Sequence, residues 1–150
     1  MLHFLYTKYD GVVPEAVLND ADEELLAKIH TTTVKTHELL EKVEIMRALQ
    51  EIMKLVTEGN VYFQQNAPWK AEPDRKAAII LTSINLCRSL SILLWPYLPG
   101  ASERLWKQLN LEGSPVTAGW KSAEKLLVKA GHKTNKPEVL FRKIEDKELK

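Results

Sequence analysis

The chain has 150 residues, of which 45% are hydrophobic and 27% charged, and its formal net charge is +1. This length suits one domain with a sizeable core, and the composition excludes a largely disordered chain. The near-neutral charge lacks the basic excess typical of nonspecific nucleic-acid binders. Residues 121–150 hold nine Lys and Arg against five Asp and Glu, which indicates a charged, solvated tail.

The first elements follow from caps and turns. Residues 1–9 are apolar and aromatic and indicate the end of a helix that Asp10 and Gly11 stop. A second helix is predicted from Asp20, because acidic side chains suit the free N–H groups and the dipole of a first turn. The residues that it directs to a core are expected to be Leu25, Leu26, Ile29, Thr33, Leu39 and Leu40.

The clearest helical pattern extends to about Gln65, with apolar residues at steps of three and four. Its expected core face, interrupted once by Gly59 and Asn60, comprises Ile45, Leu49, Ile52, Val56 and Phe63. Pro68 disfavours helical geometry at Ala67, so the helix is predicted to end there.

The next helix is predicted to start at Pro73, which suits a first turn, and to end or kink at Pro96. Apolar residues fall nearly all round it, which predicts a central place in a bundle. A shorter helix is expected from Ser102 to Leu109, followed by a loop rich in glycine and proline. Together these elements predict an all-α fold, an antiparallel bundle of about five helices with an irregular C-terminal tail.

Two units are expected: a helical bundle over residues 1–117 and a tail over 118–150 that packs on it. Cys87 is the only cysteine, so no internal disulfide can form and a reducing compartment, the cytoplasm, is expected. We find no secretory signal pattern. The apolar stretch 77–97 is interrupted by Arg88 and several polar residues, which favours a buried helix over a membrane span.

Catalytic and metal-binding signatures are not found in the sequence. It has no glycine-rich phosphate loop and no nucleophile elbow. His30 and His37 could share a helix face, but no Cys pair accompanies them to complete a zinc site. We therefore expect no catalytic residue, no metal and no cofactor in this chain, and binding remains as its function.

Four tryptophans are candidates for packing or binding. Trp95 and Trp106 lie among leucines and are expected in the core, and Trp120 is expected to pack the tail onto the bundle. Trp69 follows Pro68 at a helix–helix corner with polar neighbours, and its residue pattern leaves two readings open. It is either a core plug or an exposed platform on which an unpaired base can stack.

The string Asn-Val-Tyr-Phe-Gln-Gln-Asn-Ala-Pro-Trp, residues 60–69, closely resembles the helix-to-turn segment of the anticodon-binding domain of methionyl-tRNA synthetases. Other segments resemble this family in the same order: the Phe-Leu-Tyr-Thr-Lys-Tyr-Asp-Gly-Val of residues 4–12, the Trp-Pro-Tyr-Leu-Pro of 95–99, and the peptide 136–144. The resemblance covers nearly the whole chain and is strongest to archaeal and eukaryotic members.

The resemblance implies that Trp69 stacks on an anticodon base, that Pro68 shapes the turn, and that Asn60 and Gln64 help to form the pocket. It implies the CAU anticodon loop of tRNA(Met) as the partner, together with a catalytic domain of the same polypeptide that binds ATP and attaches methionine. The family's base-contacting Asn and Arg, in its first helix, align just before Met1. This chain is therefore expected to be a fragment, inactive alone and a weak binder of tRNA.

Two alternatives stay open at this point. One is the anticodon domain of a related class I synthetase, for leucine or cysteine, against which the Ala-Pro-Trp turn argues. The other is a helical protein-interaction module that binds a partner protein at the Trp69 corner.

Overall fold

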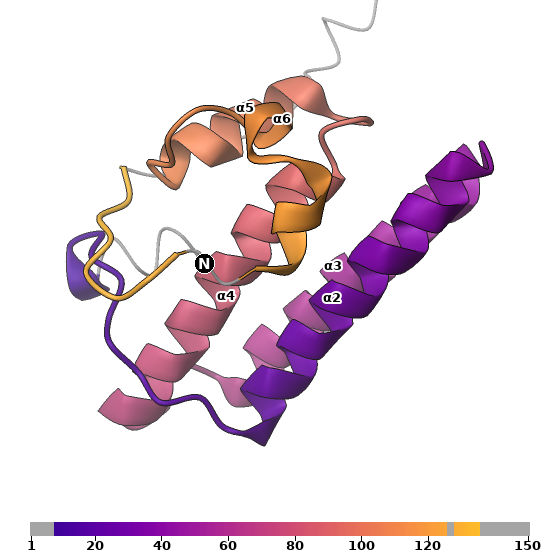
Figure 1. The fold of residues 1–150 in the computed structure, drawn as a ribbon. Helices are drawn as coiled ribbons and strands as arrows, with labels where there is room; N and C mark the ends of the chain where they lie inside the picture. The colour runs from indigo at the N-terminus through magenta and orange to yellow at the C-terminus, as the bar shows by residue number, and fades with distance from the viewer. Residues whose placement is uncertain (1–7, 126–127, 136–150) are drawn as a thin grey trace, which may run out of the picture.

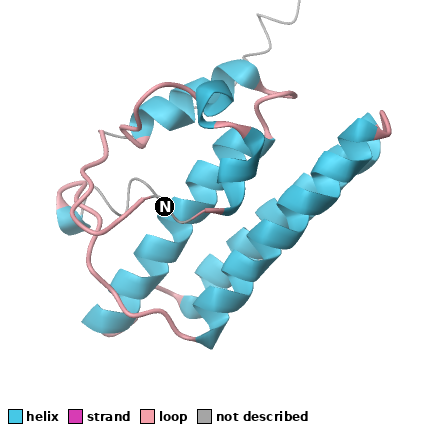
Figure 2. Cartoon of the chain, viewed as in Figure 1, coloured by secondary structure: helices cyan, strands magenta, loops and turns pink. Residues whose placement is uncertain are grey.

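The computed structural model describes residues 8–125 and 128–135 (Figure 1). Its described part is all-α, as predicted (Figure 2). A single antiparallel bridge in that part joins Val12 to Lys133. The elements in chain order are α2 (Asp20–Glu41), α3 (Ile45–Asn66), α4 (Pro73–Leu93), α5 (Pro99–Gln108), α6 (Pro115–Ala118) and the 3-10 helix η1 (Trp120–Glu124). The predicted N-terminal helix falls largely on residues 1–7, outside the described residues.

The helices α2 and α3 lie side by side as a long hairpin, and α4 runs next to them (Figure 1). Asn19 caps α2 in a capping box. Its side chain accepts a hydrogen bond from the backbone N–H of Asp22, and the Asp22 side chain accepts one from the backbone N–H of Asn19. The start predicted at Asp20 is therefore confirmed. Four of the predicted core residues are buried: Leu25, Ile29, Thr33 and Leu39. Leu26 and Leu40 are half-buried.

The predicted core face of α3 is wrong in its rotation. Ile45 is 51% exposed, and only Ile52 of the expected set is fully buried. The buried face instead comprises Ala48, Ile52, Leu55, Gly59 and Tyr62. Small residues on this face let α3 approach its neighbours closely, since a Cβ on Gly59 would stand 2.4 Å from Leu86 Cδ2 of α4.

The central position predicted for α4 is confirmed. By length and composition alone α4 could cross a membrane, but 78% of its most apolar window is buried inside the fold, as in the core helix of a soluble protein. Buried polar side chains on α4 hold both η1 and the chain that follows it. Asn85 Nδ2 donates to the Val128 carbonyl at 3.0 Å, and Arg88 Nη1 donates to the Ser122 carbonyl at 2.7 Å.

The three tryptophans other than Trp69 have different environments. Trp106 is 3% exposed, which confirms its core position, but Trp95 is only half-buried, so that prediction is wrong. Trp95 lies after α4 has ended, where its indole points to Glu103 Oε1 at 3.4 Å. Trp120 Nε1 donates to the Thr33 carbonyl at 3.2 Å. The side chain thereby packs the start of the tail onto α2, as predicted. Residues 136–150 lie outside the described residues.

Candidate nucleic-acid interface

The site is built on the turn between α3 and α4. Ala67 caps the C-terminus of α3 in the left-handed conformation, with φ 44°, and its N–H donates to the Phe63 carbonyl at 3.1 Å. A left-handed residue other than glycine costs about 1–2 kcal/mol, so the surrounding contacts must hold this turn. Lys70 N–H then donates to the Ala67 carbonyl at 2.9 Å, which closes a tight corner around Pro68 and Trp69.

Trp69 is exposed at this corner. Its relative exposure is 47%, while Pro68 before it is buried. The ring of Trp69 packs against Phe63, with centroids 6.0 Å apart and planes inclined by 58°. Of the two readings that the sequence left open, the core plug is therefore wrong: part of the ring lies against α3, and nearly half of the residue's surface is open to a ligand.

Two polar residues lie on the same side of α3. Asn60 and Gln64 are exposed and lie one helical turn apart, and Phe63 stands between them in sequence. Both amide side chains are therefore exposed on the last two turns of α3, before the corner that carries Trp69. Amides can donate and accept hydrogen bonds, which suits the edges of unpaired bases.

A buried polar network lies behind this surface. Asp22, which is fully buried, accepts from the Tyr62 hydroxyl and from Arg75 Nη1, the latter at 2.7 Å. Burial alone raises the pKa of Asp22, but the hydrogen bonds from Arg75, Tyr62 and the Asn19 backbone outweigh it and hold this pKa below its usual value. Asp22 is therefore a carboxylate that ties α2, α3 and α4 together.

The sequence reasoning missed this network and the role of Phe63. Phe63 was expected in the core and does pack against it, partly buried, but its contact with Trp69 was not expected. Acidic residues at the start of α2 were expected only as N-terminal charges. The network joins residues 53 positions apart, Asp22 and Arg75, and no local pattern carries such a contact. Trp69 lies in the turn beyond the end of α3, so no helical spacing indicates that its ring packs against Phe63.

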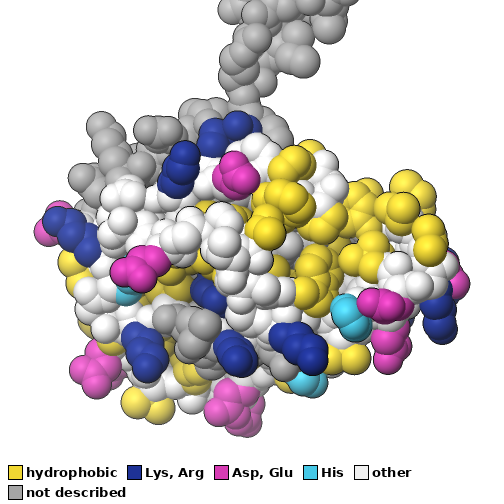
Figure 3. Space-filling model, turned by 45° about the horizontal axis from the view of Figure 1, so that its top comes forward, with side chains coloured by type: hydrophobic (Ala, Val, Ile, Leu, Met, Phe, Trp, Pro, Cys, Tyr) yellow, Lys and Arg dark blue, Asp and Glu magenta, His cyan; other side chains and the backbone are white. Residues whose placement is uncertain are grey.

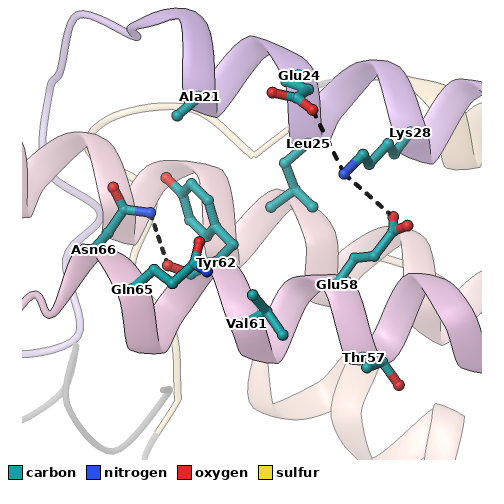
Figure 4. Close-up of a pocket in the computed structure, with 10 residues that line it drawn as sticks. All are labelled: Ala21, Glu24, Leu25, Lys28, Thr57, Glu58, Val61, Tyr62, Gln65 and Asn66. Carbon is teal, nitrogen blue, oxygen red and sulfur yellow. Dashed lines mark hydrogen bonds and ion pairs between the residues drawn. The ribbon is translucent and has the colours of Figure 1, made fainter.

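The groove between α2 and α3 is a separate feature. It has a volume of about 240 Å³, and Figure 4 shows Lys28 between Glu24 and Glu58, at 3.7 and 3.8 Å. Neither Asn60, Gln64 nor Trp69 lines it. Its lining mixes both charge signs, which gives it no preference for an anionic ligand.

The wider surface offers little other chemistry. Figure 3 shows acidic and basic side chains interspersed over the face in view, with hydrophobic side chains gathered on one side of it. Burial raises the pKa of the Cys87 thiol to about 11, which leaves it a poor nucleophile at neutral pH. Within residues 8–125 and 128–135, no three His, Cys, Asp or Glu side chains are placed to hold a metal ion.

Comparison with known proteins shows which family the chain resembles. A family model described as the anticodon binding domain of methionyl tRNA ligase matches residues 13–150. The methionine–tRNA ligase of Thermococcus onnurineus is 36% identical over 152 residues, covering 99% of this chain and 20% of that protein. The ligase of Sulfolobus acidocaldarius is 37% identical over 143 residues, covering 91% of this chain and 25% of that protein. The chain thus spans a fifth to a quarter of these relatives.

Solved structures share the fold. Apo methionyl-tRNA synthetase of Mycobacterium tuberculosis matches with a TM-score of 0.86 at 20% identity, covering 96% of this chain and 30% of that one. The structure bound by methionyl-adenylate matches with a TM-score of 0.84 at 21% identity, covering 94% and 29%. At these identities the likeness concerns the fold alone.

Proposed function

The chain belongs to the family of the anticodon binding domain of methionyl tRNA ligase, and on this premise we propose that it binds the anticodon loop of tRNA(Met) and reads CAU as unpaired bases. In this proposal Trp69 stacks on an anticodon base, and Pro68 shapes the turn that presents it. Asn60 and Gln64 supply polar contacts beside the stacked base. Single-stranded loops are the usual targets of sequence-specific RNA recognition, because their bases can be splayed onto aromatic side chains.

The observation that carries the proposal is the exposure of Trp69. A tryptophan that is 47% exposed at a tight corner, supported from one side by Phe63, is an ordered flat surface with room for a partner. Base–aromatic stacking contributes about 1–3 kcal/mol per base. This site reads a loop through stacking and amides, so a strong basic charge is not required of the chain.

The proposal extends to the whole protein. The relatives are methionine–tRNA ligases of which this chain spans about a fifth. We infer a cytoplasmic ligase whose catalytic domain binds ATP and attaches methionine to tRNA(Met), with residues 118–150 packing toward that domain. The 150-residue chain alone is expected not to aminoacylate, and formation of methionyl-tRNA by it would contradict this.

A titration followed by indole ¹⁵N NMR tests the proposal on the chain itself, even when binding is weak. The ligand is an RNA stem-loop carrying CAU, compared with the same hairpin in which the three anticodon bases are replaced. The Trp69 indole signal is expected to shift with CAU and much less with the replaced anticodon. Trp106 and Trp120, whose indoles donate to the Glu112 and Thr33 carbonyls, serve as internal references.

Variants sharpen the result. Trp69→Ala is expected to weaken CAU binding about 5- to 150-fold, the equivalent of one lost stacking contact. Trp69→Phe keeps a ring and should retain most of the affinity. Met46→Ala removes a comparably exposed apolar side chain from the opposite end of α3 and should change nothing. Equal responses to both hairpins, or none, would favour the alternative of a protein-interaction module that binds a partner protein at the Trp69 corner.

A further inference from the structure

The connection that carries Trp69 is closed at its base by side chains. Asn66 is the last residue of α3 and Arg75 the third residue of α4, so they stand on either side of residues 67–72. Arg75 Nη2 donates to Asn66 Oδ1 at 2.6 Å, and this bond joins the two ends of the connection. Asn66 Nδ2 in turn donates to the Tyr62 carbonyl at 2.7 Å, which fixes the orientation of the amide (Figure 4).

Arg75 is itself anchored. Its other terminal nitrogen, Nη1, donates to Asp22 Oδ2 at 2.7 Å, and Asp22 is fully buried in the first turn of α2. The guanidinium therefore uses its rigid fork to hold two acceptors on two different helices. A lysine ammonium is a single point of charge and cannot reproduce this fork.

We propose that Asp22, Arg75 and Asn66 are positioning residues that hold the Pro68–Trp69 corner in the orientation in which it accepts an anticodon base. The inference rests on the proposed function of Trp69. None of the three touches the RNA. They act by ordering the corner before binding, so that less side-chain and loop freedom is lost when the base stacks.

The strained backbone of the corner supports this role. Ala67 adopts the left-handed conformation, which an alanine leaves readily unless its neighbours hold it. The bond between Arg75 and Asn66 holds the residue immediately before Ala67. Without it, the turn can relax, and the contact between Phe63 and Trp69 loses its fixed geometry.

The test uses Arg75→Lys in the full chain, because this variant keeps a positive charge opposite Asp22 but loses the link to Asn66. The expected results are a largely retained thermal midpoint, a weaker nuclear Overhauser effect between the Phe63 and Trp69 rings, and a lower order parameter for the Trp69 indole. CAU hairpin affinity should fall about 3- to 10-fold, the effect of ordering one or two further side chains on binding.

Asn66→Ala is the second variant, in case Arg75→Lys does not fold. It leaves the pair of Asp22 and Arg75 intact and should loosen Trp69 in the same way. Lys28→Gln is the matched control, because it removes a cation that bridges α2 and α3 away from the turn, and Trp69 should stay ordered.

Unchanged order of Trp69 in both Arg75→Lys and Asn66→Ala overturns the inference, whatever the RNA shows. Loosened Trp69 with unchanged CAU affinity also overturns it, because the ordering would then not serve binding. If Trp69→Ala leaves CAU affinity unchanged, the proposed function fails instead, and the NMR measurements still report whether the three residues order the corner.

Discussion

Phe63 and Trp69 face each other across the end of α3, with ring centroids 6.0 Å apart and planes inclined by 58°. Phe63 belongs to the helix and Trp69 to the turn after it, so the pair links the orientation of the turn to that of the helix. Tilted aromatic pairs contribute about 0.5–1.5 kcal/mol beyond the area that they bury. A contact of this size can orient the Trp69 ring, although 47% of the residue stays exposed.

Removing Trp69 should therefore change stability little. We expect Trp69→Ala to lower the free energy of unfolding by about 1 kcal/mol, the order of a single aromatic contact. Trp106→Ala is the matched comparison, because Trp106 is 3% exposed and packs in the core. It should cost about 3–5 kcal/mol. Urea denaturation of both variants tests this, and equal losses would show that the Trp69 contact contributes as much to stability as a core tryptophan.

Stability should depend on acid through Asp22. Its folded-state pKa lies below the ordinary value of 3.8, so its ionised form stabilises the fold above about that pH. This contribution is lost as the pH falls through the lowered pKa. Asp22→Asn should cost about 3 kcal/mol at neutral pH, as for a broken buried ion pair, and should flatten the acid limb of a denaturation series. Asp20→Asn, an exposed change in the same turn, should keep the wild-type slope.

The close approach of α3 and α4 at Gly59 predicts a steric effect. Gly59→Ala places a Cβ 2.4 Å from Leu86 Cδ2, closer than two carbon atoms can approach without one of them moving. Overpacking of this kind costs about 1–3 kcal/mol. Gly100→Ala, whose Cβ would stand 3.3 Å from the flexible end of Arg104, is the control. A lowered thermal midpoint is expected only for Gly59→Ala, and equal midpoints would show that Leu86 moves aside freely.

Asn85 should anchor the returning chain. Its side chain donates to the Val128 carbonyl and accepts from the Val128 N–H, at 3.0 and 3.1 Å, in a buried setting. Asn85→Ala leaves both backbone groups of Val128 without these partners and should cost about 2–3 kcal/mol. Hydrogen exchange at the Val128 amide should accelerate. Asn110→Ala removes one exposed bond to the Lys133 carbonyl and should leave that exchange rate unchanged.

Some helix boundaries could be predicted because their chemistry is local, but α5 begins at Pro99 and not at the predicted Ser102, because Pro99 takes the first helical position. The start of α2 follows from acidic residues after Asn19, and the start of α4 follows from Pro73 in a first turn. The rotation of α3 could not be predicted in the same way. A pattern of large apolar residues predicts that Ile45 is buried. The buried face instead includes Ala48 and Gly59, whose small size makes them a weak signal in a hydrophobic pattern.

The candidate site was predicted in part for the same reason. Pro68 marks the corner in the sequence, and Asn60 and Gln64 share a helix face by spacing alone. Whether Trp69 points inward or outward depends on the packing of three helices, so the residue pattern could not decide it. The ties from Asp22 to Tyr62 and Arg75 span 40 and 53 positions, and no local motif encodes them.

These long spans have a kinetic consequence. The ties from Asp22 to Tyr62 and Arg75 close only when α2 has docked on both α3 and α4, and contacts between distant residues are the slow ones to form. During refolding, an isolated α3–α4 hairpin would already carry Trp69 and the Asn66–Arg75 pair, but Arg75 would lack its anchor on Asp22. RNA-binding competence should therefore emerge in the last phase of refolding, after helix content has recovered.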